Sequence, residues 1–155
     1  MGMDFYDSDR ELEAQTGASV NLIFDVEGES GFRIRETHML EDLTSRSNVL
    51  LATGGGAILK RENRELLRRT GLVVYLQVSV HQQLHRLSRD RTRPLLQCED
   101  REDKLNAMAE ARNPLYEEIA DIVFPSLNRG PAFAARVLAG KIQSLRAMKS
   151  PHTAQ

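Results

Sequence analysis

Short runs of β-branched and other apolar residues alternate along the chain with longer stretches of helical period. Four such runs predict strands, at residues 4–6, 49–53, 73–78 and 122–124. Strands that are separated by helices favour a parallel sheet, because each crossover helix packs against one of its faces. The pattern therefore predicts an α/β fold in which one parallel sheet forms the middle of three layers.

The helical stretches carry their own start signals. Residues 28–31, Gly-Glu-Ser-Gly, lead into a helix with one apolar stripe, formed by Phe32, Met39, Leu40 and Leu43. Ser79 is expected to cap a later helix, and Pro131 to open the last one. No repeat or linker divides the chain, so we expect a single domain over residues 1–150 and a frayed tail at 151–155.

Composition narrows the range of partners. The 155 residues include 21 Lys and Arg and 22 Asp and Glu, a net charge of −1, which gives no general attraction to nucleic acid or to an anionic membrane. The longest apolar run, Leu72 to Leu76, is too short to cross a bilayer, and the first residues do not resemble a signal peptide. The only cysteine, Cys98, fits a reducing cytoplasm. We therefore expect a cytoplasmic protein whose anionic ligands are held locally.

The first candidate site is the sequence Phe-Tyr-Asp-Ser-Asp at residues 5–9, where a predicted strand meets a helix. Residues i and i+2 of an extended segment point the same way, so Asp7 and Asp9 can present two carboxylates to one cleft at the carboxyl edge of the sheet. This suits a metal-bound phosphoryl donor on one carboxylate and a substrate hydroxyl on the other. The alternative is that Ser8 or Asp9 only caps the helix.

Two further features favour an anionic ligand. Gly54, Gly55 and Gly56 directly follow a predicted strand, and without Cβ atoms their N–H groups can approach a small ligand closely. Arg33 lies at the margin of the apolar stripe, where its guanidinium could make a forked contact with a carboxylate. The alternatives are a structural turn and an ordinary solvated arginine.

A pair of arginine motifs lies further along the chain, Arg-Pro-Leu-Leu from Arg93 and Arg-Asn-Pro-Leu-Tyr from Arg112. Residues 88–103 are charged and poorly periodic, which suits either a flap that closes arginines onto phosphate oxygens or an ordinary exposed loop. His81 and His85 are spaced for a shared metal, but no third ligand is evident, so a solvated helix face is favoured.

Taken in this order, the segments resemble shikimate kinase, a family with the nucleoside-monophosphate-kinase-like P-loop fold. The resemblance runs from Phe5 to about Asp121 and includes Ile-Phe-Asp-Val-Glu-Gly-Glu at residues 23–29, Gly-Phe-Arg at 31–33 and Leu-Ala-Thr-Gly-Gly-Gly at 51–56. Each piece alone is weak, whereas the ordered set is highly specific.

The resemblance implies transfer of the γ-phosphoryl group of ATP to the 3-hydroxyl of shikimate, a step of aromatic amino-acid biosynthesis. Asp9 would bond the reacting hydroxyl as the candidate base. Arg33 and Arg112 would hold the substrate carboxylate, together with N–H groups of residues 54–56. Arg93 would meet the nucleotide phosphates. Residues 125–131 would correspond loosely to an adenine loop.

The same resemblance implies that Asp7 acts near Mg²⁺ through water, because Mg²⁺ gives up its hydration shell reluctantly. It also implies a monomer for the full-length protein. The expected partners are therefore shikimate and ATP, with neither nucleic acid nor a membrane.

Members of this family begin with a strand, a G-x-x-x-x-G-K-[S/T] phosphate loop and a helix, and the 155 residues contain no such loop. The family's first strand lies in mid-sheet, between the strands that correspond to residues 49–53 and 73–78. We therefore expect an N-terminally truncated kinase with impaired activity. The alternative is a natural non-catalytic relative that keeps a shikimate-binding pocket. A kinase for another small polyol is weakened by the joint presence of Arg33, Arg112 and the glycine triplet.

Overall fold

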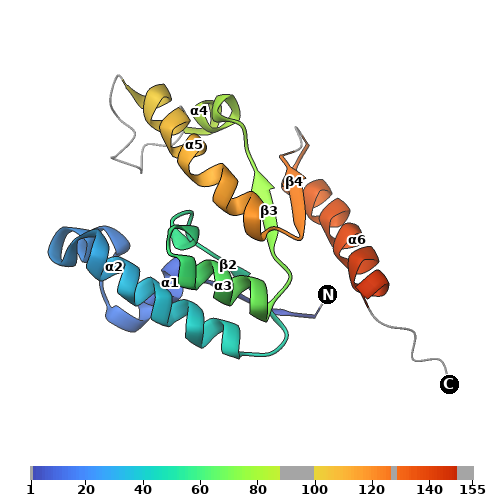
Figure 1. The fold of residues 1–155 in the computed structure, drawn as a ribbon, viewed down its shortest axis with the longest axis horizontal. Helices are drawn as coiled ribbons and strands as arrows, with labels where there is room; N and C mark the ends of the chain where they lie inside the picture. Colours follow the sequence, from blue (N-terminus) through green and yellow to red (C-terminus); the bar gives the residue numbers. More distant parts are fainter. Residues whose placement is uncertain (1, 88–99, 127–128, 150–155) are drawn as a thin grey trace.

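The computed structural model describes residues 2–87, 100–126 and 129–149 (Figure 1). All four predicted strands are confirmed, and no end differs from its prediction by more than one residue. Arg93, Cys98 and the tail lie outside the described residues. The elements are, in chain order, β1 (Asp4–Asp7), α1 (Ser8–Thr16), α2 (Val20–Ser45), β2 (Val49–Ala52), the 3₁₀ helix η1 (Ala57–Leu59), α3 (Arg61–Thr70), β3 (Val74–Gln77), α4 (Val80–Leu87), α5 (Arg101–Ile119), β4 (Ile122–Pro125) and α6 (Pro131–Lys149).

The strands form two parallel pairs. β1 pairs with β2, with Asp4 opposite Val49, and β3 pairs with β4, with Val74 opposite Ile122. Within the described residues the strands are parallel, as predicted, but the two pairs are not hydrogen-bonded to each other and do not form one continuous sheet. The physical reason is that no described segment lies between the pairs to supply the backbone donors and acceptors that would join them.

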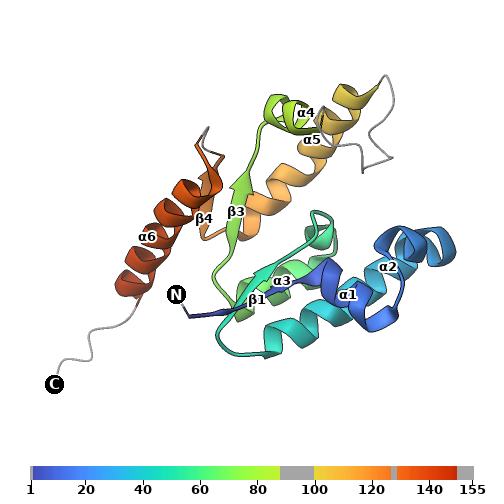
Figure 2. The same ribbon diagram turned by 180° about the vertical axis from the view of Figure 1, so that it is seen from behind.

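The two faces of the strands differ in their cover. Tyr6 of β1 and Leu51 of β2 pack against the main core, and Tyr75 of β3 stacks on Tyr116 of α5. On the opposite face, the register partners Phe5 and Leu50 are 60% and 53% exposed, and Leu76 of β3 is 60% exposed. Figure 2 views β1 and β2 from this side, where they lie in front of α3.

α6 covers part of this second face. Phe124 of β4 is buried, and the ammonium group of Lys141 in α6 lies 5.6 Å from the centroid of its ring. Leu76, the register partner of Phe124, nevertheless stays exposed. The helices therefore cover this face over β4 but leave β1, β2 and β3 with exposed apolar side chains.

The main core lies between α1, α2 and the first strand pair. It contains the predicted stripe residues Phe32, Met39 and Leu43, together with Leu12 and Ile23. Leu40, the fourth residue of the stripe, is also buried, so the predicted face is confirmed. This core fixes the face of α2 that carries Arg33.

α2 begins earlier than its sequence predicts. Ser19 is its N-cap, with Oγ accepting from the Leu22 N–H at 3.2 Å, so the glycines at 28 and 31 do not precede the helix but interrupt it. Gly28 has φ 72° and ψ 179°, a conformation open essentially to glycine alone. A Cβ on Gly31 would lie 2.6 Å from Glu27 Cβ. The glycines therefore allow a sharp kink that redirects the helix just before Arg33.

The later helices agree with their start signals. The Ser79 Oγ accepts from the Gln82 N–H at 3.2 Å at the start of α4, and Pro131 opens α6. Residues 101–103, expected in a flap, instead form the first turn of α5, where Glu102 and Asp103 suit the positive end of the helix dipole. No helix among the described residues has the length and apolar character needed to span a bilayer.

Candidate functional site

The glycine triplet forms a loop at the carboxyl end of β2, beside the carboxyl end of β1. The Gly54 N–H donates to the Ser8 Oγ at 3.3 Å, and the Gly54 carbonyl accepts from the Ala57 N–H at 3.1 Å. Ser8 is buried at the start of α1. The loop is thus tied to α1 on one side and to η1 on the other.

Asp9 lies against this loop. A Cβ on Gly54 would lie 3.0 Å from the Asp9 Oδ1, so the missing side chain makes room for the carboxylate. Burial raises the pKa of Asp9, and the nearby carboxylates of Asp7 and Glu13 raise it further against the opposing charge of Arg33. Asp9 is therefore a carboxyl group with increased proton affinity.

Asp7, not Ser8 or Asp9, caps the helix. Its Oδ1 accepts from the N–H groups of Asp9 and Arg10, at 3.0 and 3.3 Å, and its backbone is still extended. The alternative assigned to Ser8 and Asp9 is wrong, since the side chains of both face the glycine loop. The Oδ1 of Asp7 is therefore used as a helix cap.

Arg33 is enclosed. Its side chain is 12% exposed, and its Nη1 donates to the Glu36 Oε2 at 2.7 Å. Its guanidinium also lies 5.2 Å from the ring centroid of Phe32. A Cβ on Gly56 would overlap that guanidinium, 2.6 Å from Cζ. The solvated-arginine alternative is therefore wrong, and Gly56 is required for Arg33 to reach the loop.

Glu36 completes this group. The residue is 2% exposed, and its Oε1 has no hydrogen-bond partner among the described residues. Burial raises its pKa, whereas the hydrogen bond and charge of Arg33 lower it. The carboxylate thus fixes the orientation of the guanidinium of Arg33 at the pocket wall.

The third side of the loop is formed by α5. Arg112 Nη1 would lie 3.6 Å from a Cβ on Gly55, and the hydroxyl of Tyr116 donates to the Gly55 carbonyl at 2.5 Å. The glycine loop is therefore surrounded by the guanidiniums of Arg33 and Arg112 and by the carboxyl group of Asp9, whose pKa is raised. This arrangement suits a small ligand that carries both a carboxylate and a hydroxyl group.

The structure thus brings together most of the predicted site, namely Asp9, Arg33, Gly54, Gly55, Gly56 and Arg112. Sequence reasoning missed Ser8, Glu36 and Tyr116. The last two carried a signal that was not used, because they lie three and four residues after an arginine on the same helix, where side chains are neighbours. Arg93 is not among the described residues.

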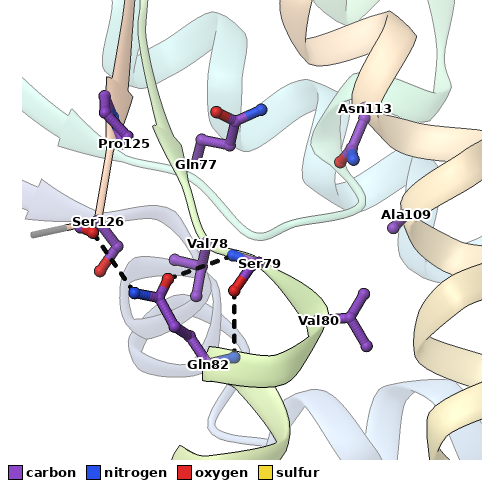
Figure 3. Close-up of a pocket in the computed structure, with 9 residues that line it drawn as sticks. All are labelled: Gln77, Val78, Ser79, Val80, Gln82, Ala109, Asn113, Pro125 and Ser126. Carbon is purple, nitrogen blue, oxygen red and sulfur yellow. Dashed lines mark hydrogen bonds between the residues drawn. The ribbon is translucent and has the colours of Figure 1, made fainter. Parts of the chain in front are cut away.

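A second pocket, of about 340 Å³, lies at the carboxyl ends of β3 and β4, between α4 and α5 (Figure 3). Gln82 bridges its wall: its Nε2 lies 3.5 Å from the Ser126 carbonyl, and its Oε1 accepts from the Ser79 N–H at 3.3 Å. The described residues that line it all have neutral side chains: Gln77, Val78, Ser79, Val80, Gln82, Ala109, Asn113, Pro125 and Ser126. Across residues 2–87, 100–126 and 129–149, no group of three or more His, Cys, Asp and Glu could hold a metal.

The fold and the loop define a small α/β protein in which a glycine loop and charged side chains gather at the carboxyl ends of parallel strands. Solved structures support this class. The shikimate kinase from Acinetobacter baumannii in complex with shikimate has a TM-score of 0.83 and 49% identity, over 97% of this chain and 82% of that one. The shikimate kinase from Aquifex aeolicus has a TM-score of 0.75 and 27% identity, over 96% and 84%.

Sequence comparison identifies the family. Residues 1–143 match the family described as shikimate kinase. The shikimate kinase of Shewanella pealeana is 48% identical over 140 residues, which cover 90% of this chain and 80% of that protein. That of Burkholderia thailandensis is 55% identical over 128 residues, or 80% and 70%. The chain belongs to the shikimate kinase family, whose members are phosphotransferases.

Proposed function

We propose that the glycine-loop pocket binds shikimate and that the protein transfers the γ-phosphoryl group of ATP to its 3-hydroxyl, giving 3-phosphoshikimate. The observation that carries this proposal is the convergence of Asp9, Arg33 and Arg112 on residues 54–56. A planar carboxylate fits the fork of a guanidinium, and two guanidiniums neutralise it on different sides. The ligand named for the Acinetobacter baumannii structure has the same chemistry.

Asp9 is proposed as the base. Phosphoryl transfer to a hydroxyl releases a proton, and a carboxylate with a raised pKa accepts it more readily than an ordinary aspartate does. In the balanced step, the substrate oxygen forms a bond to the γ-phosphorus, the bond from that phosphorus to the β-γ bridging oxygen breaks, and the hydroxyl proton moves to Asp9. ADP leaves with the electron pair.

The phosphoryl donor needs a further segment. We propose that a strand, a G-x-x-x-x-G-K-[S/T] loop and a helix join residues 1–150 as one domain, with the strand between β2 and β3. Two features support this. The two strand pairs are not joined among the described residues, and Phe5, Leu50 and Leu76 leave an apolar face without helix cover. A strand followed by a helix would satisfy both the strand edges and that face.

The nucleotide would then approach the pocket at the ends of β3 and β4. Pro125 and Ser126 line it, at the position expected for the adenine loop. Arg93 is proposed to meet the nucleotide phosphates. Mg²⁺ fits the available donors only through water and phosphate, since Asp7 already uses Oδ1 as a helix cap. It would neutralise charge on the transferring group.

We also propose that the full-length protein is a monomer and that it is cytoplasmic, the location resting on the single cysteine.

A second candidate function is shikimate binding without catalysis. It is favoured by one observation, the lack of a phosphate-loop sequence in the 155 residues.

The test compares two proteins. The first is the 155-residue chain, and the second carries in addition a strand, a G-x-x-x-x-G-K-[S/T] loop and a helix at its N-terminus. We expect both to bind shikimate in calorimetry, and only the second to form 3-phosphoshikimate from ATP. A matched control carries the same unit with its loop lysine replaced by methionine, which should abolish transfer. A folded extended protein that binds shikimate without turnover would support the non-catalytic alternative instead. One that binds no shikimate would contradict both.

A further inference from the structure

Two tyrosines connect β3, α5 and the glycine loop. The hydroxyl of Tyr116 donates to the Gly55 carbonyl at 2.5 Å, and its ring stacks on that of Tyr75 with a centroid distance of 4.7 Å and an interplanar angle of 18°. The Tyr75 hydroxyl in turn donates to Asn113 Oδ1 at 2.9 Å, back on α5. The Tyr116 ring is therefore held from the side, which fixes the direction of its hydroxyl.

The hydrogen bond from Tyr116 determines the orientation of the peptide bond between Gly55 and Gly56. In a planar trans peptide, the carbonyl of Gly55 and the N–H of Gly56 point in opposite directions. Holding the carbonyl toward Tyr116 therefore turns the Gly56 N–H to the other side of the loop. Gly56 is buried, and within the described part of the chain its N–H has no acceptor. A buried amide of this kind requires a partner.

We infer that Tyr116 is a positioning residue for the acid group of the ligand: it orients the Gly56 N–H toward a carboxylate held at Arg33, whose guanidinium packs on Gly56. This inference rests on the proposed function. Arg112 lies four residues before Tyr116, so the two side chains leave the same face of α5. One helix thus delivers both the guanidinium and the hydroxyl that aims the loop. The adjacent Arg33 guanidinium packs directly on Gly56.

The test is Tyr116→Phe, which keeps the stacked ring and removes only the hydroxyl. Loss of one neutral hydrogen bond predicts shikimate binding weaker by about twofold to tenfold in calorimetry. Methyl shikimate, whose ester carbonyl is a weaker acceptor than a carboxylate, should lose less affinity from the substitution than shikimate does. The matched control is Tyr6→Phe, which removes the hydroxyl of a tyrosine of β1 that packs against the main core. This variant should bind both ligands as the unaltered chain does.

The outcomes separate this inference from the proposed function. Equal binding of shikimate by Tyr116→Phe and the unaltered chain would overturn the inference alone. Equal losses for shikimate and its ester, together with a lower melting temperature, would show a merely structural role and would also overturn it. If the unaltered chain binds no shikimate, both the proposed function and the inference are wrong. In the extended kinase, the inference further predicts a raised KM for shikimate with an unchanged KM for ATP.

Discussion

The surroundings of the glycine loop and those of the second pocket differ in charge. At the loop, the charges of Asp9, Arg33, Glu36 and Arg112 are gathered from three helices and partly enclosed. At the ends of β3 and β4, the lining side chains that the structure describes are all neutral. Charged side chains held in one place can select a charged acceptor, whereas a highly charged donor needs anchors that the neutral pocket does not supply. Among the described residues, the charged groups that could hold an acidic acceptor therefore lie at the glycine loop, and the described lining of the second pocket offers none.

The largest effect is expected from Asp9→Asn in the extended kinase. The substitution removes the proton acceptor at the reacting hydroxyl, so turnover should fall by about 10²- to 10⁴-fold. Steady-state kinetics with both substrates measures this, and Asp25→Asn on the exposed side of α2 is the control. Unchanged turnover would remove Asp9 from the mechanism and leave the loop as a binding site only.

The same substitution has a stability consequence of known sign. Because the folded protein raises the pKa of Asp9, the native state favours its protonated form, and its stability falls as pH rises through the ordinary range of aspartate toward the raised value. Asn cannot ionise, so Asp9→Asn should melt at a higher temperature than the parent at pH 7. At pH 3 the difference should shrink. A lower melting temperature at pH 7 would contradict the assigned shift.

The next effect is expected from Gly56→Ala. The new methyl group would overlap the Arg33 guanidinium, which Glu36 holds in place. Loss of a charge-assisted contact predicts shikimate binding weaker by about 10- to 100-fold in calorimetry. Gly71→Ala is a matched control, since its φ of −155° suits any residue and nothing lies within 4 Å of the added carbon. Equal shikimate affinities for the two variants would show that Arg33 does not contact the ligand.

A smaller effect is expected from Arg112→Lys. An ammonium keeps the charge but cannot make two parallel hydrogen bonds to a carboxylate, so shikimate affinity should fall about tenfold. Gln82→Ala in the second pocket should leave it unchanged, which sharpens the contrast between the two regions. A greater loss from Gln82→Ala than from Arg112→Lys would reverse the assignment of acceptor and donor sides.

The smallest effect is expected from Glu27→Gln. Glu27 and Arg35 form a double hydrogen bond at 2.7 and 2.8 Å across the kink of α2, and both lie near the surface. Exposed ion pairs contribute little, so the melting temperature should change by no more than about 2 °C, and shikimate affinity should stay the same. A marked loss of affinity would mean that the kink itself has to be held for Arg33 to bind.

The sequence predicted the strands and several of the residues that lie at the glycine loop, but for different reasons. Apolar runs such as residues 49–52 predict strands because local pattern and burial agree there. The glycine triplet predicted N–H groups that a small ligand could approach, which stays a prediction; the atoms that lie against the triplet in the structure are those of Asp9, Arg33 and Tyr116. Contacts of that kind are between residues far apart in the chain, so local pattern could place Tyr116 beside Arg112 on one helix but could not pair Tyr116 or Ser8 with the loop.

The remaining differences also have physical causes. The start of α2 was misplaced because glycine at 28 looks like a helix boundary in sequence, whereas the helix continues beyond it after a single residue with positive φ. The single sheet was not obtained, because pairing depends on which strands are present to fill each edge. Neither outcome follows from the composition of the segment concerned.

The break at Gly28 has a consequence for how the family can vary. In an uninterrupted helix, one inserted residue turns everything beyond it by about 100° about the axis. The abrupt change of direction at Gly28 separates residues 20–27 from the part of α2 that carries Arg33. Insertions and deletions in that first part are therefore expected to leave the arginine on its original face, so length variation among homologues should concentrate there.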